Sequence, residues 1–326
     1  MGARRLLKRL RAAVARATFD PGDDAGTHDL LWSKGLARLC DVSGPPGYYL
    51  AHTEAVQPPG VIGDAYAGAA GLVWVRLGSG ARLGDPCDLD SFVAEALPRI
   101  TEPFVLVSGD GDISVPGELP ADTVARLLAS PLLVAWLTQN HDGGGDGRIA
   151  PLPIGLDLHT PRPFDSPMRL AEALRSIAAE RVAAAAQPLS VFCDVGLALS
   201  PERARAVDAL AGCDHVVMAT RRLPQRTIWR RYASHPFVLS APGNGLDCHR
   251  TWEALYLGSM VVARRSALDP LYEGLPVLLV DDWSDIRDRA RLEDFRAASA
   301  ELAAPERVGR LLDARARLAA WRALLP

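Results

Sequence analysis

The chain has almost no lysine, no long apolar run and no paired cysteines. Each of these absences disfavours a class of protein or a cellular location. Lys8 and Lys34 are the only lysines, so its positive charge comes from arginine, which makes forked contacts with phosphates, although a GC-rich genome explains the same bias. No apolar run approaches the roughly 20 residues that span a bilayer. The five cysteines are scattered and form no CxxC pair, a pattern typical of reduced thiols. We therefore expect a cytoplasmic protein.

A strong charge bias is also missing. The formal net charge is −3 and the isoelectric point is near 6.2, which disfavours a nucleic-acid-binding protein. There is no internal repeat, and no dinucleotide-binding fingerprint lies near the start, which disfavours a sugar-nucleotide epimerase. A length of 326 residues indicates about two domains.

The first 17 residues combine leucines at helical spacing with six basic side chains. Such a helix could lie on an anionic membrane surface, at the inner face of the membrane. Alternatively, it is a terminal helix that packs its leucines on the body of the protein.

Strand and helix patterns alternate along most of the chain. We expect strands at 47–52, 72–77, 104–108, 132–138, 189–193, 215–219, 237–240, 260–263 and 277–280. We expect helices at 121–128, 168–186, 201–211, 227–232, 248–257 and 305–325, the last of which could pack back on the first domain. Strands that alternate with helices predict parallel sheets with right-handed crossovers.

A proline-rich segment at 160–166 reads as a linker between two such α/β units. We place the boundary there, with an N-terminal domain over 1–162 and a C-terminal domain over 163–326. Ligands gather at the carboxyl ends of parallel strands. The loops after residues 108, 193, 219 and 240 should therefore lie near one another.

The most informative segment covers residues 237–283. A buried strand leads to a glycine-rich turn that contains Asn244 and Gly245, and Asp247 should cap the helix that follows. A strand, a glycine-rich turn and a helix N-terminus form an arrangement that receives phosphates.

Three polar residues share one face of this helix: His249, Arg250 and Glu253. Arg250 in the first turn could hold a diphosphate, and Glu253 one turn further could accept hydrogen bonds from ribose hydroxyls. The pattern thus fits a nucleotide. An exposed ion pair between Arg250 and Glu253 behind an ordinary turn explains the same residues.

The segment GNGLDCHRTWEALYLGSMVVA resembles the donor-site motif of exostosin-type glycosyltransferases. It is most similar to the exostosin-like group that includes ribitol xylosyltransferases. Further blocks of similarity occur at 139–160, 222–232 and 266–283, and the resemblance covers roughly 105–285.

The resemblance implies a GT-B-like fold: two Rossmann-like α/β domains whose parallel sheets face a central cleft. It implies that Arg250 contacts the donor phosphates, that Glu253 contacts the ribose, and that Asn244 and Gly245 shape the loop. The donor would be a sugar nucleotide, expected to be UDP-linked, and no metal or other cofactor would be required. The acceptor can differ from that of the family, and we expect a glycan or a lipid-linked glycan.

Two further groups of residues are candidates for the cleft. Asp112, with Asp110 and His141 as substitutes, could act as the general base on the acceptor hydroxyl, although these residues could equally cap a turn before Pro116. Arg222 and Arg226 could supplement Arg250 against the diphosphate.

Two alternative functions remain open at this point. Asp110 and Asp112 also spell the DxD motif with which metal-dependent GT-A glycosyltransferases hold a divalent ion. The chain could also be a module that binds a sugar nucleotide without transferring the sugar.

Overall fold

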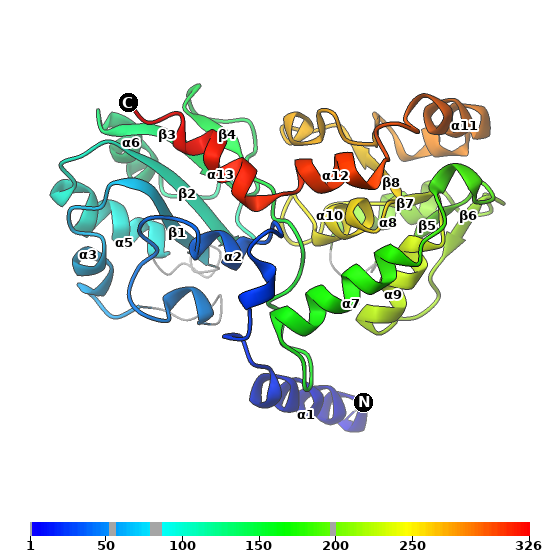
Figure 1. The fold of residues 1–326 in the computed structure, drawn as a ribbon, viewed down its shortest axis with the longest axis horizontal. Helices are drawn as coiled ribbons and strands as arrows, with labels where there is room; N and C mark the ends of the chain where they lie inside the picture. Colours follow the sequence, from blue (N-terminus) through cyan, green and yellow to red (C-terminus); the bar gives the residue numbers. More distant parts are fainter. Residues whose placement is uncertain (1, 52–56, 79–86, 196–199) are drawn as a thin grey trace.

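The computed structural model describes residues 2–51, 57–78, 87–195 and 200–326. They form two lobes side by side, each built on a parallel sheet (Figure 1). This confirms the predicted α/β fold class, with two Rossmann-like units that each hold a parallel sheet. Among the described residues, no helix is long and apolar enough to cross a membrane.

The first sheet has the order β1-β2-β3-β4 and is parallel throughout. Its first two strands, β1 and β2, are almost wholly buried, which explains their continuous apolar runs. The strands are β1 (Gly71–Gly78), β2 (Phe104–Gly111), β3 (Leu133–Thr138) and β4 (Ile149–Pro151).

The strand predicted at 47–52 is wrong. Gly47 has φ +75°, a left-handed conformation, and starts the short 3-10 helix Tyr48–Leu50. The turn directs Tyr48 into the core, where its ring meets the edge of Trp74 and its hydroxyl donates to Asp88. Burial of the aromatic ring in a turn outweighs its preference for a strand.

The second sheet has the order β6-β5-β7-β8-β9 and is also parallel. The chain leaves β5 in one direction to reach β6 and returns to its other side for β7, so the order reverses between β5 and β7. Crevices at such switch points hold ligands in open α/β sheets. The strands are β5 (Val191–Cys193), β6 (Val216–Met218), β7 (Phe237–Leu239), β8 (Met260–Arg264) and β9 (Val277–Val280).

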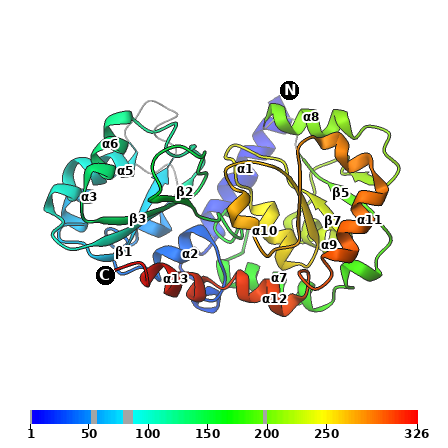
Figure 2. The same ribbon diagram turned by 90° about the horizontal axis from the view of Figure 1, so that it is seen from above.

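Helices cover the faces of both sheets (Figures 1 and 2). Those of the first lobe and its approach are α1 (Gly2–Thr18), α2 (Ser33–Ala37), α3 (Val61–Ala65), α5 (Asp88–Ser91) and α6 (Ala121–Ala129). Those that follow are α7 (Pro167–Ala179), α8 (Pro201–Ala209), α9 (Gln225–Ala233), α10 (His249–Tyr256), α11 (Arg289–Ala298), α12 (Pro305–Leu311) and α13 (Ala314–Arg322).

Helix α1 covers the predicted range, and Figure 1 shows it projecting beneath the two lobes. Its last turn is anchored, because Ala15 is buried and Thr18 accepts the amide of Phe164. Further out, Leu10 is 60% exposed. This leucine does not pack on the body of the protein, which disfavours the second of the two interpretations of this segment.

The predicted C-terminal helix is broken into α12 and α13. Asp313 breaks it, since its side chain caps α13 by accepting the amide of Ala316 while its backbone pairs with Leu30. Helix α13 then contacts β1, and Arg322 pairs with Asp41. The chain thus ends on the first lobe. A domain boundary at residue 162 stays a prediction.

We predict that this return of the chain stabilises the first lobe. Leu318 on α13 is 6% exposed and belongs to the main core, so Leu318→Ala should lower the free energy of unfolding by about 2–5 kcal/mol. Leu324→Ala is the matched control, because Leu324 is 49% exposed and its loss should cost less than about 0.5 kcal/mol. Urea unfolding measures both, and equal stabilities of the two variants would contradict this role of α13.

Candidate functional site

The carboxyl ends of the two sheets meet, and several hydrogen bonds join them. Asn140, after β3, accepts the amide of Asp247 at 2.9 Å. Asn244 donates to Asp112, after β2, at 3.2 Å. Nδ1 of His249 lies 2.7 Å from the carbonyl oxygen of Gly155. The loops after residues 108 and 240 are therefore neighbours, as the sequence predicts.

Helix α10 is placed by a buried carboxylate that precedes it. Asp247 was expected to be the N-cap, but that position belongs to Cys248, and Asp247 lies one residue earlier. Its carboxylate instead accepts the amide of Ile154 and the side-chain indole N–H of Trp252. At its other end α10 closes on Gly258 (φ +83°), as predicted.

Gly245 lies where the loop before α10 packs against the first lobe. A Cβ atom at this position would lie 2.6 Å from Oδ1 of Asn140. The missing side chain therefore lets the loop approach the first lobe closely. A role of Gly245 and Asn244 in shaping the loop around a diphosphate stays a prediction.

Arg250 lies at the switch point of the second sheet. Its Nε donates to Asp194, which directly follows β5, at 2.5 Å, and both side chains are 11% exposed. Burial opposes the charge of the guanidinium, but Asp194 outweighs burial and raises the pKa of Arg250 above its ordinary value. Nη1 of Arg250 has no hydrogen-bond partner among the described residues, so the guanidinium retains a donor for an anion.

Glu253 lies one turn further along α10 and is 3% exposed. The side-chain amide of Gln225 donates to both of its oxygens, at 3.1 and 3.2 Å. Burial, together with the nearby charge of Asp157, raises the pKa of Glu253 to about 7. The carboxyl group therefore changes its charge near neutral pH.

The ends of β2 and β3 carry two residues in the left-handed region that are not glycine. Asp110 has φ +57° and Asn140 has φ +54°, conformations that cluster at functional sites. Polar contacts hold both side chains in place. Asp110 forms an ion pair with Lys34 at 3.3 Å, and the side-chain amide of Asn140 donates to the carbonyl of Gly111. In a DxD motif the carboxylate of Asp110 would bind the metal ion, but here it pairs with the ammonium group of Lys34. This disfavours the metal-dependent GT-A alternative.

The other predicted residues of the first lobe lie in the same region. Asp112 is half-buried and faces Asn244 across the interface. His141 is buried, with Nε2 3.1 Å from the carbonyl of Gly144 and with no hydrogen-bond partner at Nδ1 among the described residues. Whether either side chain is the general base stays a prediction.

The two supplementary arginines are placed differently. Arg222 is exposed, and Arg226 on α9 makes a forked ion pair with Asp165 of the linker, at 2.7 and 2.9 Å. A contact of Arg226 with a diphosphate would require this pair to break, and for both arginines the donor-site role stays a prediction.

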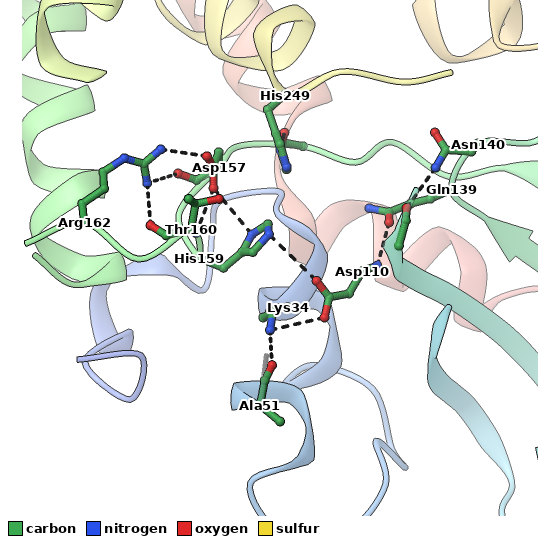
Figure 3. A network of polar contacts seen from close by, with 12 residues as sticks. Lys34, Ala51, Asp110, Gln139, Asn140, Asp157, His159, Thr160, Arg162 and His249 are labelled. Carbon is green, nitrogen blue, oxygen red and sulfur yellow. Dashed lines mark hydrogen bonds and ion pairs between the residues drawn. The ribbon is translucent and has the colours of Figure 1, made fainter. Parts of the chain in front are cut away.

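Sequence reasoning missed one cluster, shown in Figure 3. Asp157 and His159 come from the segment after β4, and His249 is the first residue of α10; one ligand atom from each lies within 4.8 Å of the others. No metal site was expected, because no ligand spacing is visible in the sequence. The signal was absent because the histidines belong to separate segments that only the fold brings together.

A cavity of about 340 Å³ lies beside the α10 loop, at the carboxyl ends of β7 and β8. Ser240, Pro242 and Thr251 line it on the side of α10, and Arg264 lines it from β8. Small-molecule sites have volumes of this order. The cavity therefore adjoins the loop and helix that the sequence singled out.

No family model matches the chain, and no curated protein matches it. Among solved structures it is similar to an alpha,alpha-trehalose-phosphate synthase (UDP-forming) from Burkholderia vietnamiensis. The identity is 12% and the TM-score 0.44, over 77% of this chain and 72% of the other. A likeness at this level says nothing of activity.

We predict that Glu253 makes the stability of the protein depend on pH. Its pKa rises from 4.5 to about 7 on folding, so the stabilisation is complete below pH 4.5 and is lost as the pH rises through 7. Glu253→Gln should remove up to roughly 3 kcal/mol of this pH dependence. Urea unfolding between pH 5 and 8 measures it. Glu293→Gln, at an exposed position, should retain the wild-type dependence; an unchanged slope in Glu253→Gln would contradict the shift.

Proposed function

We propose that the chain is a glycosyltransferase that binds a sugar nucleotide between its lobes and transfers the sugar to a hydroxyl group. The observation that carries this proposal is the placement of Arg250 and Glu253. They lie one turn apart on α10, at the switch point of the second sheet, and α10 begins where the two lobes meet.

The donor phosphates would lie at the loop before α10 and at the start of that helix. Backbone N–H groups and the positive end of the helix dipole favour an anion there, and Arg250 adds a charged donor. Asp194 holds this arginine in place. Positive charge is thus present without a metal ion at the diphosphate, and the donor binding that we propose is metal-independent.

Glu253 would take the ribose, whose vicinal hydroxyl groups can donate to a carboxylate. Its two oxygens accept hydrogen bonds from Gln225, which supports a role as an acceptor. The cavity at β7 and β8 offers room for another part of the donor. The resemblance to exostosin-like enzymes supports this order of phosphate and ribose along the helix and suggests a UDP-linked donor.

The acceptor would approach from the first lobe. Asp112 is bound to the donor loop through Asn244, so a carboxylate of one lobe already lies against the nucleotide segment of the other. General-base catalysis requires such a carboxylate within hydrogen-bond reach of the attacking hydroxyl. A glycan or lipid-linked glycan fits the exostosin-like resemblance.

Helix α1 supports the lipid-linked form of the acceptor. It projects from the body, Leu10 and Val14 are exposed on it, and basic residues surround them in the sequence. A basic amphipathic helix of this kind binds anionic membrane surfaces. We propose that it brings the protein to the inner face of a membrane.

We predict that Arg250→Ala weakens the binding of a nucleoside diphosphate by about 1.5–3 kcal/mol, the contribution of a charge-assisted hydrogen bond. Titration calorimetry with UDP measures the affinity. Because the alanine removes the ion-pair partner of Asp194, Arg250→Lys is a second variant, which keeps the positive charge and loses the forked guanidinium.

Arg230→Ala is the matched control, since Arg230 is an exposed arginine on α9 and its loss should leave the affinity unchanged. Addition of Mg²⁺ or Mn²⁺ should also leave it unchanged. Wild-type affinity in both folded Arg250 variants would remove this residue from the site.

A kinetic prediction separates the two carboxylates. Asp112→Asn should lower kcat by about 10²–10⁴-fold and preserve donor affinity, as expected for a general base. Glu253→Gln should instead raise the KM for the donor. Normal turnover by Asp112→Asn would make His141 the next candidate. Donor binding by the wild type with no release of nucleoside diphosphate would identify a binding module.

A further inference from the structure

We propose that Asp157, His159 and His249 form a binding site for a divalent transition-metal ion of the zinc type. The ion would join the segment after β4 to the first residue of α10. This inference does not depend on the proposed glycosyl transfer.

The tautomer of His249 is suited to a metal ligand. Its Nδ1 lies 2.7 Å from the carbonyl oxygen of Gly155, which can only accept, so Nδ1 carries the hydrogen. The lone pair is then on Nε2. A backbone carbonyl that orients a histidine in this way is a common feature of metal sites.

His159 supplies a second imidazole. Its side chain is 17% exposed, its ring centroid lies 5.3 Å from that of His249, and its Nδ1 has no hydrogen-bond partner among the described residues. An imidazole with an unused ring nitrogen can bind a metal ion through that nitrogen.

Asp157 supplies the carboxylate. Oδ2 pairs with Arg162 at 2.7 Å, and Oδ1 accepts the amide of Thr160 at 3.0 Å and lies 3.8 Å from Nδ1 of His159. Arg162 and Thr160 thus hold the carboxylate beside the two rings.

The spacing and the ligand types indicate which ion would fit. The three ligand atoms lie within 4.8 Å of one another, and zinc bonds of 2.0–2.1 Å in a tetrahedron require about 3.3 Å, a difference that side-chain rotation can close. Two imidazoles with one carboxylate favour zinc, cobalt or nickel over magnesium. The site is therefore distinct from a magnesium or manganese site at a diphosphate.

The charges around the cluster are nearly balanced. Arg162 offsets Asp157, and Lys34 offsets Asp110, whose Oδ1 lies 3.9 Å from Nε2 of His159. Three protein ligands leave the fourth position of a tetrahedral ion open, as in catalytic rather than structural zinc sites. Asp110 is the nearest further carboxylate.

The test is metal binding by the full chain, without any sugar nucleotide. Protein stripped by a chelator is titrated with Co²⁺, and the d–d absorption of the bound ion is recorded; Zn²⁺ should then displace it. We expect one ion per chain, and we expect His159→Ala to weaken the affinity at least about 100-fold, beyond the effect of altering a residue that only orients a ligand.

His28→Ala is the matched control, because His28 lies outside the cluster and its loss should leave one site per chain. Asp157→Asn should weaken binding as well and serves if His159→Ala does not fold. The proposal is overturned if the wild type takes up no Co²⁺ at micromolar concentration, or if both folded variants bind it as tightly as the wild type. UDP affinity is measured separately, so failure of either proposal is visible on its own.

Discussion

The buried carboxylate of Asp247 is the contact on which the arrangement of both lobes depends. It accepts the amide of Ile154 from the segment after the first sheet and the indole N–H of Trp252 from α10, and its own amide donates to Asn140. Burial raises the pKa of Asp247 to about 6, so it is largely ionised at neutral pH. A buried ionised group must be surrounded by donors, and these donors come from both lobes. The direction of α10 therefore depends on the first lobe.

This constraint explains why unusual backbone conformations occur at the ends of β2 and β3. Asp110 and Asn140 each adopt a left-handed conformation, and each is held by at least one polar contact. Asn140 must turn this way to reach both Gly111 and Asp247. Gly245 must lack a side chain for the same reason, because Asn140 occupies the space of its Cβ atom. The left-handed backbone of Asn140 in the first lobe and the glycine at position 245 in the second lobe therefore serve the same contact between the lobes.

The two proposals use two neighbouring residues at the start of α10. Arg250 points to Asp194 and the switch point of the second sheet, where an anion is favoured. His249 points to Gly155 and the segment after β4, where two imidazoles and a carboxylate favour a cation. Glu253 responds to the charges of the second group, since Asp157 raises its pKa and His249 lowers it. An ion at the cluster would therefore favour the charged form of Glu253.

The sequence by itself determined the two α/β units and the importance of residues 237–283. Apolar runs alternating with amphipathic helices leave few other ways to bury their surface, which is why β1, β2 and β3 and the strands of the second sheet were predicted. The strand at 47–52 and the unbroken C-terminal helix were wrong, because burial of Tyr48 and pairing of Asp313 with Leu30 are long-range effects.

Only the tertiary structure decided which polar residues meet. The ion pairs of Arg250 with Asp194 and of Arg226 with Asp165, and the cluster of Asp157 with two histidines, join segments that lie far apart in the sequence. Local patterns record the face that a side chain occupies on its own helix or strand. They do not record its partner, because that depends on how two separately formed sheets bring their carboxyl ends together.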